Sequence, residues 1–155
     1  MRRLNDRVIL GVIAGLGANL VKEGIAETSV STGLSKYTCR RMIPLVLLTK
    51  KYARTWKGWV IGTSTDMSVA AFTGILIAYT LSYTGRDYAK IKGVIISSGL
   101  LDQVFNFFSA ILPQVRKDPN SNVICKAIHI VFGITAASII TRLADPSLFG
   151  ENCPQ

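Results

Sequence analysis

The residues best able to do chemistry in this sequence are polar and ionisable side chains that interrupt long apolar runs. Asp66 is the single charge in WVIGTSTDMSVAAFTGILIAYTLSYTG, residues 59–85, and Asp102 stands in the apolar run GLLDQVFNFF together with Gln103 and Asn106. A bare carboxylate deep in a bilayer costs about 2.5–3.5 kcal/mol on insertion scales. We therefore expect both carboxylates to face the protein interior, where each is paired or protonated.

A depth estimate brings these residues into one half of the membrane. A rise of about 1.5 Å per residue places Asp66, Asp102 and His129 in the half nearest the basic segment 33–57, on the side where Lys22 ends the first apolar run. The sequence therefore predicts a polar intramembrane cavity on this side, lined by Asp66, Asp102, Gln103, Asn106, His129, Lys22 and Lys126.

Two interpretations of this cavity are open from the sequence. In the first, Asp66, Asp102 and His129 form a site for a proton or a small solute, since ionisable residues inside a membrane are usually functional. In the second, these side chains pair with Lys22, with Lys126 or with nearby Ser, Thr and Asn side chains, and fix the packing of the helices.

No residue pattern in the sequence specifies catalysis or cofactor binding. There is no Walker loop or Rossmann fingerprint, no visible nucleophile–base arrangement, and the lone His129 cannot supply both axial ligands of a b-type haem. Cys39, Cys125 and Cys153 lack CxxC spacing, so neither a disulfide framework nor a zinc site is indicated. We expect no enzymatic activity, no metal and no cofactor.

The composition is that of a membrane protein. Hydrophobic residues make up 49% of the 155 residues and charged residues only 17%, against about 25% charged residues in a typical soluble domain. A spanning helix needs about 20 mostly apolar residues, and a helix satisfies its own backbone hydrogen bonds in lipid. We expect an all-α fold, an integral membrane four-helix bundle forming one domain over residues 1–155, with spans at about 8–28, 58–84, 94–113 and 123–143.

A basic connector joins the first two expected spans. Within it, residues 36–54 have a short apolar core, MIPLVLL, which is flanked by Lys and Arg and interrupted by Pro44, so we expect an amphipathic segment in the membrane interface. Trp56, Trp59 and Arg142 stand at span boundaries, where they are expected to anchor the helices at headgroup level. More Lys and Arg residues fall on the connector side, which favours a cytoplasmic connector and external termini.

The positive net charge and the spacing of small residues indicate what the protein contacts. The net charge of +9 comes from basic residues between apolar runs, as expected beside anionic headgroups, so we expect a lipid bilayer and no nucleic acid. Gly11-x-x-x-Gly15 and Ala14-x-x-x-Ala18 are small-xxx-small patterns, which let helices approach closely. They serve either packing within the protomer or association, as a homo-oligomer or with a membrane-protein partner.

Three stretches resemble a known family. GVIAGLGANLVKEGI, GLSKYT and YTGRDYAKIKG resemble the YqhR-type conserved membrane proteins of Gram-positive bacteria, which share a Gly-rich first helix with a Lys near its end, here Lys22, and a polar turn before the third helix. The resemblance covers residues 8–93, implies a multi-pass protein of the bacterial plasma membrane, and brings no established activity. The residues that match the turn are Thr84, Gly85, Arg86, Asp87, Lys92 and Gly93.

Taken together, the sequence favours a structural or accessory membrane component that associates with itself or with a membrane partner. The alternative is a small channel or transporter-like protein that conducts protons or a small solute through the cavity near Asp66 and Asp102.

Overall fold

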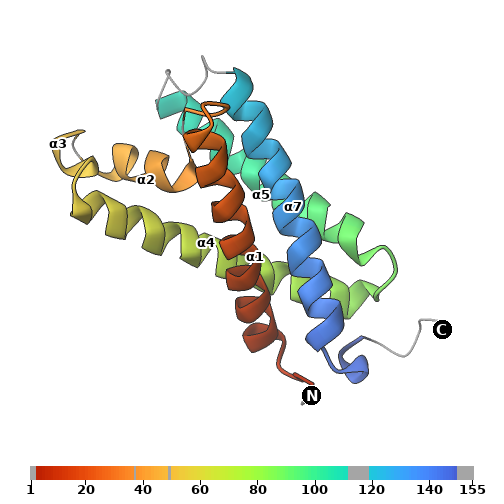
Figure 1. The fold of residues 1–155 in the computed structure, drawn as a ribbon. Helices are drawn as coiled ribbons and strands as arrows, with labels where there is room; N and C mark the ends of the chain where they lie inside the picture. Colours follow the sequence, from red (N-terminus) through yellow and green to blue (C-terminus); the bar gives the residue numbers. More distant parts are fainter. Residues whose placement is uncertain (1–2, 37, 49, 112–118, 150–155) are drawn as a thin grey trace.

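The computed structural model describes residues 3–36, 38–48, 50–111 and 119–149, and these residues are mostly helical. Apart from an isolated bridge between Leu4 and Ala144, the described residues form no β-structure, so the expected all-α fold is confirmed. The long helices are α1 (Arg7–Ser31), α4 (Trp56–Thr84), α5 (Ala89–Ile111) and α7 (Pro119–Leu143), and the short ones are α2 (Cys39–Leu47), α3 (Lys50–Ala53) and η1 (Pro146–Leu148) (Figure 1).

Within the described part of the chain, three helices are long and apolar enough to cross a membrane. They are α1, α4 and the Asn120–Leu143 portion of α7, which correspond to the first, second and fourth expected spans and indicate a membrane protein. Helix α5 covers most of the third expected span but begins earlier, at Ala89. The end expected for that span, at Pro113, lies outside the described residues.

Helix α1 runs further than the expected span 8–28. At its start, Oδ1 of Asp6 accepts hydrogen bonds from the backbone N–H groups of Val8 and Ile9, at 2.7 and 2.9 Å, and so caps the helix. At its end the chain turns through Gly33, whose φ of 75° is a left-handed conformation that glycine adopts without strain. The helix continues past Lys22 because this side chain is buried against other helices.

Helices α1 and α4 approach so closely that side chains at their contact must be small. A Cβ atom on Gly11 would overlap the backbone of Ile75, and one on Gly15 would overlap the carbonyl of Ala70. Gly74 faces the same two glycines from α4. The small-residue pattern predicted from the sequence therefore lies at a helix contact inside this chain.

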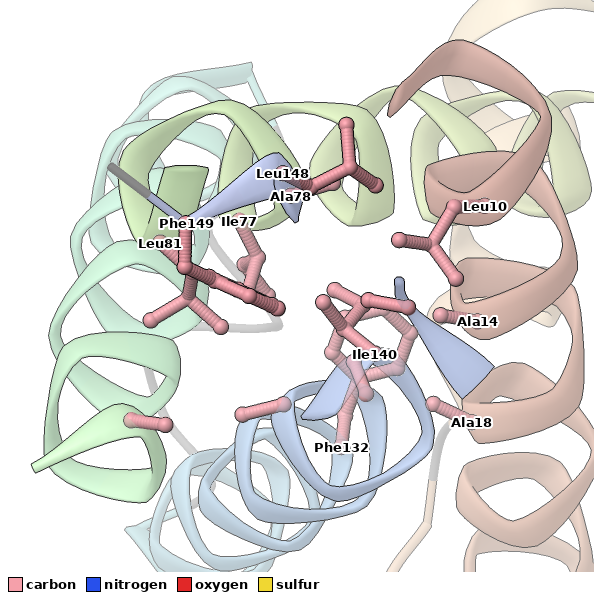
Figure 2. Packing of buried hydrophobic residues seen from close by; sticks show 14 of the residues in the cluster. Leu10, Ala14, Ala18, Ile77, Ala78, Leu81, Phe132, Ile140, Leu148 and Phe149 are labelled. Atoms are coloured by element: carbon pink, nitrogen blue, oxygen red, sulfur yellow. The ribbon is translucent and has the colours of Figure 1, made fainter. Parts of the chain in front are cut away.

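The hydrophobic core lies where α1, α4 and α7 meet. Ala14 and Ala18 are fully buried there, and the C-terminal segment after α7 adds Leu148 and Phe149 (Figure 2). Large side chains fill the space that the small ones leave, which joins the three helices into one packed unit. Those in the cluster are Leu10, Ile77, Leu81, Phe132 and Ile140.

Helix α5 pairs with α7 through another close contact between small residues. Gly93 and Gly133 face each other without room for a Cβ atom on either. One turn further along α5, the hydroxyl of Ser97 donates a hydrogen bond to the carbonyl of His129, at 3.0 Å. This pairing fixes the register of α5 against α7.

The predicted interfacial segment 36–54 contains α2 and α3, and α2 packs along α4 (Figure 1). The sequence suggested that Pro44 interrupts this segment. In the structure Pro44 instead lies inside α2. Proline has no N–H to donate to the carbonyl four residues earlier, which is that of Arg40. Gly62 of α4 lies directly against that carbonyl and against the Pro44 ring, so the carbonyl that lacks this helical partner lies at a helix contact.

The two ends of the described chain meet at one end of the molecule. Leu4 N–H donates to the carbonyl of Leu143 at 2.9 Å, and Asp145 N–H donates to the carbonyl of Leu4 at 3.0 Å. Asp145 also caps η1, and the hydrogen bond from the Ser147 backbone N–H lowers the pKa of its carboxyl group below the ordinary value. The Ser82 hydroxyl, near the end of α4, donates to the carbonyl of Leu148 at 2.6 Å.

Candidate functional site

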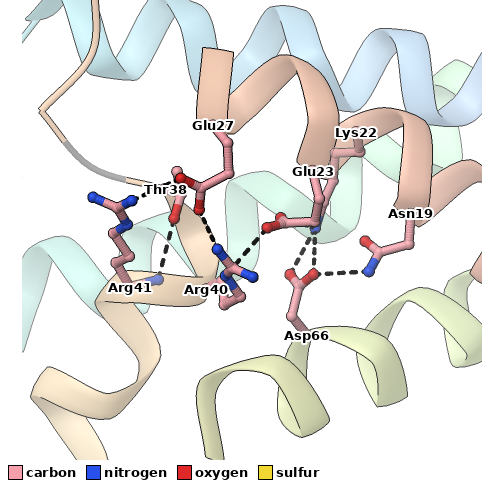
Figure 3. Close-up of polar contacts among 8 residues, drawn as sticks. All are labelled: Asn19, Lys22, Glu23, Glu27, Thr38, Arg40, Arg41 and Asp66. Atoms are coloured by element: carbon pink, nitrogen blue, oxygen red, sulfur yellow. Dashed lines mark hydrogen bonds and ion pairs between the residues drawn. The ribbon is translucent and has the colours of Figure 1, made fainter. Parts of the chain in front are cut away.

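Among the residues that the structure describes, the most buried charged side chains are Lys22 and Asp66, which form an ion pair between α1 and α4. Lys22 Nζ lies 2.6 Å from Asp66 Oδ1 and 2.8 Å from Asp66 Oδ2, so the ammonium group contacts both carboxylate oxygens (Figure 3). Only 3% of Lys22 and 6% of Asp66 is exposed. A buried charge requires such a partner, because desolvation of an unpaired ion is far more costly.

An amide completes the surroundings of the carboxylate. Asn19 Nδ2 donates to Asp66 Oδ2 at 3.0 Å, so Asp66 receives bonds from two side chains of α1. Asn19 is itself 3% exposed, and its Oδ1 atom accepts no hydrogen bond. Both oxygens of Asp66 are therefore occupied by side chains of the same chain.

The network extends from this pair to α2 through a second set of charges. Arg40 pairs with Glu27 and also contacts Glu23, with Nε 3.5 Å from Oε2. Arg41 reaches the other Glu27 oxygen at 2.7 Å, and Lys22 lies 3.4 Å from Glu23. We call the set of Asn19, Lys22, Glu23, Glu27, Arg40, Arg41 and Asp66 the polar cluster; it holds three positive and three negative side chains.

Helical spacing explains why α1 supplies so many of these groups. Asn19, Glu23 and Glu27 recur every four residues, and Lys22 is three residues after Asn19. Residues three and four apart lie on one face of a helix. This face meets α4 at Asp66 and the start of α2 at Arg40, so one helix face joins three elements.

A pocket of about 200 Å³ adjoins the polar cluster. Side chains from α1, α2, α4, α5 and α7 line it, and those from α2 and α5 are mainly apolar. Lys22 and Asp66 form part of its wall, and His129 and Phe132 reach it from α7. The pocket thus has an ionic wall, while most of its lining is apolar.

His129 has one fixed hydrogen bond. Its Nδ1 atom lies 2.8 Å from the carbonyl of Cys125. Because a carbonyl oxygen only accepts, Nδ1 carries the proton in this contact. In the neutral ring the other nitrogen, Nε2, is then the acceptor.

The structure brings three of the seven predicted cavity residues to this pocket, namely Lys22, Asp66 and His129. Lys126 and Gln103 are exposed instead and do not line it. Helical geometry explains the exposure of Lys126, since a rotation of about 100° per residue turns it away from the face shared by Cys125 and His129. The side chains of the remaining two, Asp102 and Asn106, lie outside the described part of the structure.

The predicted interface anchors are all on the surface. Trp56 is 71% exposed and Trp59 57% exposed, and Arg142 is also exposed. The guanidinium group of Arg40 lies 5.8 Å from the centre of the Trp59 ring, within the range of a cation–π contact. Trp59 therefore links the outer surface of α4 to the polar cluster.

Sequence reasoning missed five members of the polar cluster. Asn19, Glu23 and Glu27 carry a detectable signal, because their four-residue spacing continues beyond the apolar run of α1. Arg40 and Arg41 carry none, since nothing in a basic connector indicates which of its residues turn inward. Only the return of α2 onto α4 brings them to the carboxylates.

The chemistry open to this arrangement is limited. Among the residues that the structure describes, no three His, Cys, Asp or Glu side chains lie close enough to hold a metal ion. The cluster joins cations to carboxylates, and its one amide donates to Asp66. Such an arrangement suits holding helices together, and its position beside a pocket suits binding.

Comparison with protein-family models, curated proteins and solved structures found no match to this chain.

Proposed function

We propose that this protein is an accessory component of a bacterial plasma membrane, without enzymatic activity, that associates with itself or with a membrane partner. The observation that carries the proposal is the pairing of charges within the polar cluster. Asp66 gives both oxygens to Lys22 and Asn19, and the charges of the cluster balance. An ion or proton path needs ionisable groups that face a solute, whereas these groups face one another.

A fourth membrane crossing by α5 is part of this proposal. The turn from α4 to α5 lies at the same end of the molecule as the end of α7. Ser82 near the end of α4 bonds to Leu148, and Arg86 in the turn contacts Phe149, both in the segment after α7. Helix α5 packs against α7 and is 23 residues long, roughly 35 Å at about 1.5 Å per residue. This length matches a hydrocarbon core of about 30 Å and supports a four-helix membrane bundle, as does the resemblance to YqhR-type proteins.

An open helix surface supports association. Gly24, in the second half of α1, has no atom within 4 Å of the position where a Cβ would stand. It borders a shallow groove with Thr28 and Thr32, which recur every four residues on the same face. Small residues at this spacing allow another helix to approach closely.

Native mass spectrometry after extraction in a mild detergent tests the accessory function. We expect a defined homo-oligomer or a partner at fixed stoichiometry, which Gly24→Leu disrupts because the larger side chain fills the groove. Gly99→Leu is the matched control, since Gly99 on α5 also has open surroundings but does not border this groove. A strictly monomeric wild-type protein without a partner would contradict the proposal.

A second candidate, a small channel or transporter, is favoured by the pocket beside Lys22, Asp66 and His129. Under this hypothesis, proteoliposomes would show a proton or small-solute flux, and Asp66→Asn would abolish it while helix content and monodispersity stay unchanged. His129→Gln tests the titratable side chain that α7 contributes to the pocket wall. The absence of wild-type flux under several gradients, in both orientations, would eliminate this candidate.

A further inference from the structure

We infer that the pocket beside the polar cluster is a binding site for one hydrocarbon chain of a membrane amphiphile. This inference goes beyond the accessory function, because a bound chain requires neither an oligomer nor a protein partner. It rests on the position, lining and size of the pocket, and on the bonds already made by its polar groups.

The pocket lies beside the middle of α4. Ala70, one of its lining residues, is the central residue of α4, so it lies roughly 20 Å from either end at about 1.5 Å per residue. Around that depth the protein is surrounded by lipid chains rather than by water or headgroups. A chain of the bilayer is therefore the nearest available occupant.

The lining is suited to hydrocarbon. Met42 and Ile43 of α2, Val69 and Ala70 of α4, and Leu100 of α5 face the space, together with Phe132 of α7. Surfaces lined by such side chains take apolar ligands. The lining thus favours a chain over water or an ion.

Several polar groups in the wall already have partners. Asp66 is bound by Lys22 and Asn19, the Ser97 hydroxyl donates to the carbonyl of His129, and the Thr73 hydroxyl donates to the carbonyl of Val69. Groups that are satisfied in this way gain little from a polar ligand. Recognition therefore rests mainly on the apolar side chains.

Size and access select a single chain. A dry cavity of about 150 Å³ holds benzene, so about 200 Å³ holds several methylene groups, whereas a helix of about 10 Å diameter does not fit. Three lining residues are also exposed to the outside: Leu47 at 60%, Val69 at 44% and Val104 at 39%. They mark an opening between α2, α4 and α5 through which a chain reaches the pocket from the bilayer.

Photolabelling of the full-length protein tests the inference. The protein is purified in a steroid-based detergent, which has no alkyl chain to compete, and labelled separately with palmitic acid and with phosphatidylglycerol that carry a mid-chain diazirine. We expect saturable adducts in peptides covering residues 65–73 and 97–104, lost when hexadecane is added as a headgroup-free competitor. Labelling by one probe alone identifies a free fatty acid or a membrane lipid as the source of the chain.

Two tryptophan substitutions provide matched controls. Val69→Trp fills the pocket and should abolish the saturable adducts, while Val60→Trp, at a similarly exposed valine of the same helix that does not line the pocket, should leave them. Val104→Trp repeats the test from α5 in case the first variant misfolds. Adducts that hexadecane does not displace, or that persist in folded Val69→Trp or Val104→Trp protein, would overturn the inference.

Discussion

Substitution of either Lys22 or Asp66 is expected to destabilise the protein. Each side chain is almost fully buried. Loss of Lys22 would remove the ion-pair partner of Asp66, and loss of Asp66 would leave Lys22 with the more distant carboxylate of Glu23, at 3.4 Å. A buried ion pair adds little net stability over a well-packed apolar pair, yet loss of one partner is strongly destabilising. The pair therefore specifies which face of α1 meets α4 rather than how strongly the two helices adhere.

Asp66→Asn should lower the free energy of unfolding by about 3 kcal/mol, because it removes the nearest counterion of the buried Lys22 ammonium group and leaves only the Glu23 carboxylate at 3.4 Å. The double variant Lys22→Met with Asp66→Leu should recover most of this loss, since it removes both charges. Denaturation in mixed micelles, followed by circular dichroism, measures both changes. Equal losses in the single and double variants would show that an uncompensated buried charge is not the cause of the destabilisation.

A different residue-scale constraint acts at Gly15, where a side chain has no room. Gly15→Ala should lower the free energy of unfolding by roughly 1–3 kcal/mol, because its Cβ would overlap the carbonyl of Ala70 and force the helices apart. Gly24→Ala in the same helix has open surroundings and should be neutral or stabilising. The comparison uses the same micelle denaturation; a tolerated Gly15→Ala would mean that α1 and α4 are further apart.

At the scale of elements, α2 is the piece whose position depends most on the polar cluster. It is a helix of nine residues, too short to be stable in isolation. Met42, Ile43 and Pro44 are buried where α2 packs along α4, and Arg40 and Arg41 tie its first turn to Glu27 of α1. Packing and charge thus hold α2 from two sides.

Glu27→Gln should loosen α2, because it removes the carboxylate that both arginines share. Amide hydrogen exchange in residues 39–47 should accelerate, while exchange in the buried part of α7 around Phe132 should not change. Arg41→Gln, which removes only the more exposed contact, should have a smaller effect. Unchanged exchange in α2 of the Glu27→Gln variant would show that apolar packing alone positions it.

The sequence predicted the long helices better than the contacts between them. Long apolar runs without proline define α1, α4 and α7 by composition alone, and the pairing of Asp66 with Lys22 was one of two interpretations. The position of Pro44 inside α2 was not predictable, because the helix tolerates it through a contact with Gly62, 18 positions later in the sequence. The exposure of Lys126 depended likewise on which face of α7 turns inward.

At the scale of the whole molecule, the first and last helices are joined at one end. The bonds between Leu4 and the Leu143–Asp145 segment place the start of α1 beside the end of α7, and the turn from α4 to α5 lies at the same end because Arg86 covers Phe149. The connector with α2 and α3 follows the opposite end of α1 (Figure 1). This arrangement suits an even number of membrane crossings.

Cysteine accessibility in oriented vesicles tests that arrangement. In a variant with Cys39, Cys125 and Cys153 replaced by serine, cysteines introduced at the exposed positions Asn5 and Lys90 should react with an impermeant maleimide from one side. A cysteine at Leu34, which is 61% exposed, should react only from the other side. Labelling of positions 5 and 90 from opposite sides would rule out four crossings.

The separation of Lys22 from Asp66 along the chain has a consequence for biosynthesis. The two residues are 44 positions apart, so a ribosome delivers the ammonium group to the translocon well before its counterion has been made. Release of α1 into lipid at that moment would place the Lys22 ammonium group in the bilayer without Asp66. We therefore expect α1 to remain beside the insertion machinery until α4 has been made, and the two helices to enter the bilayer together.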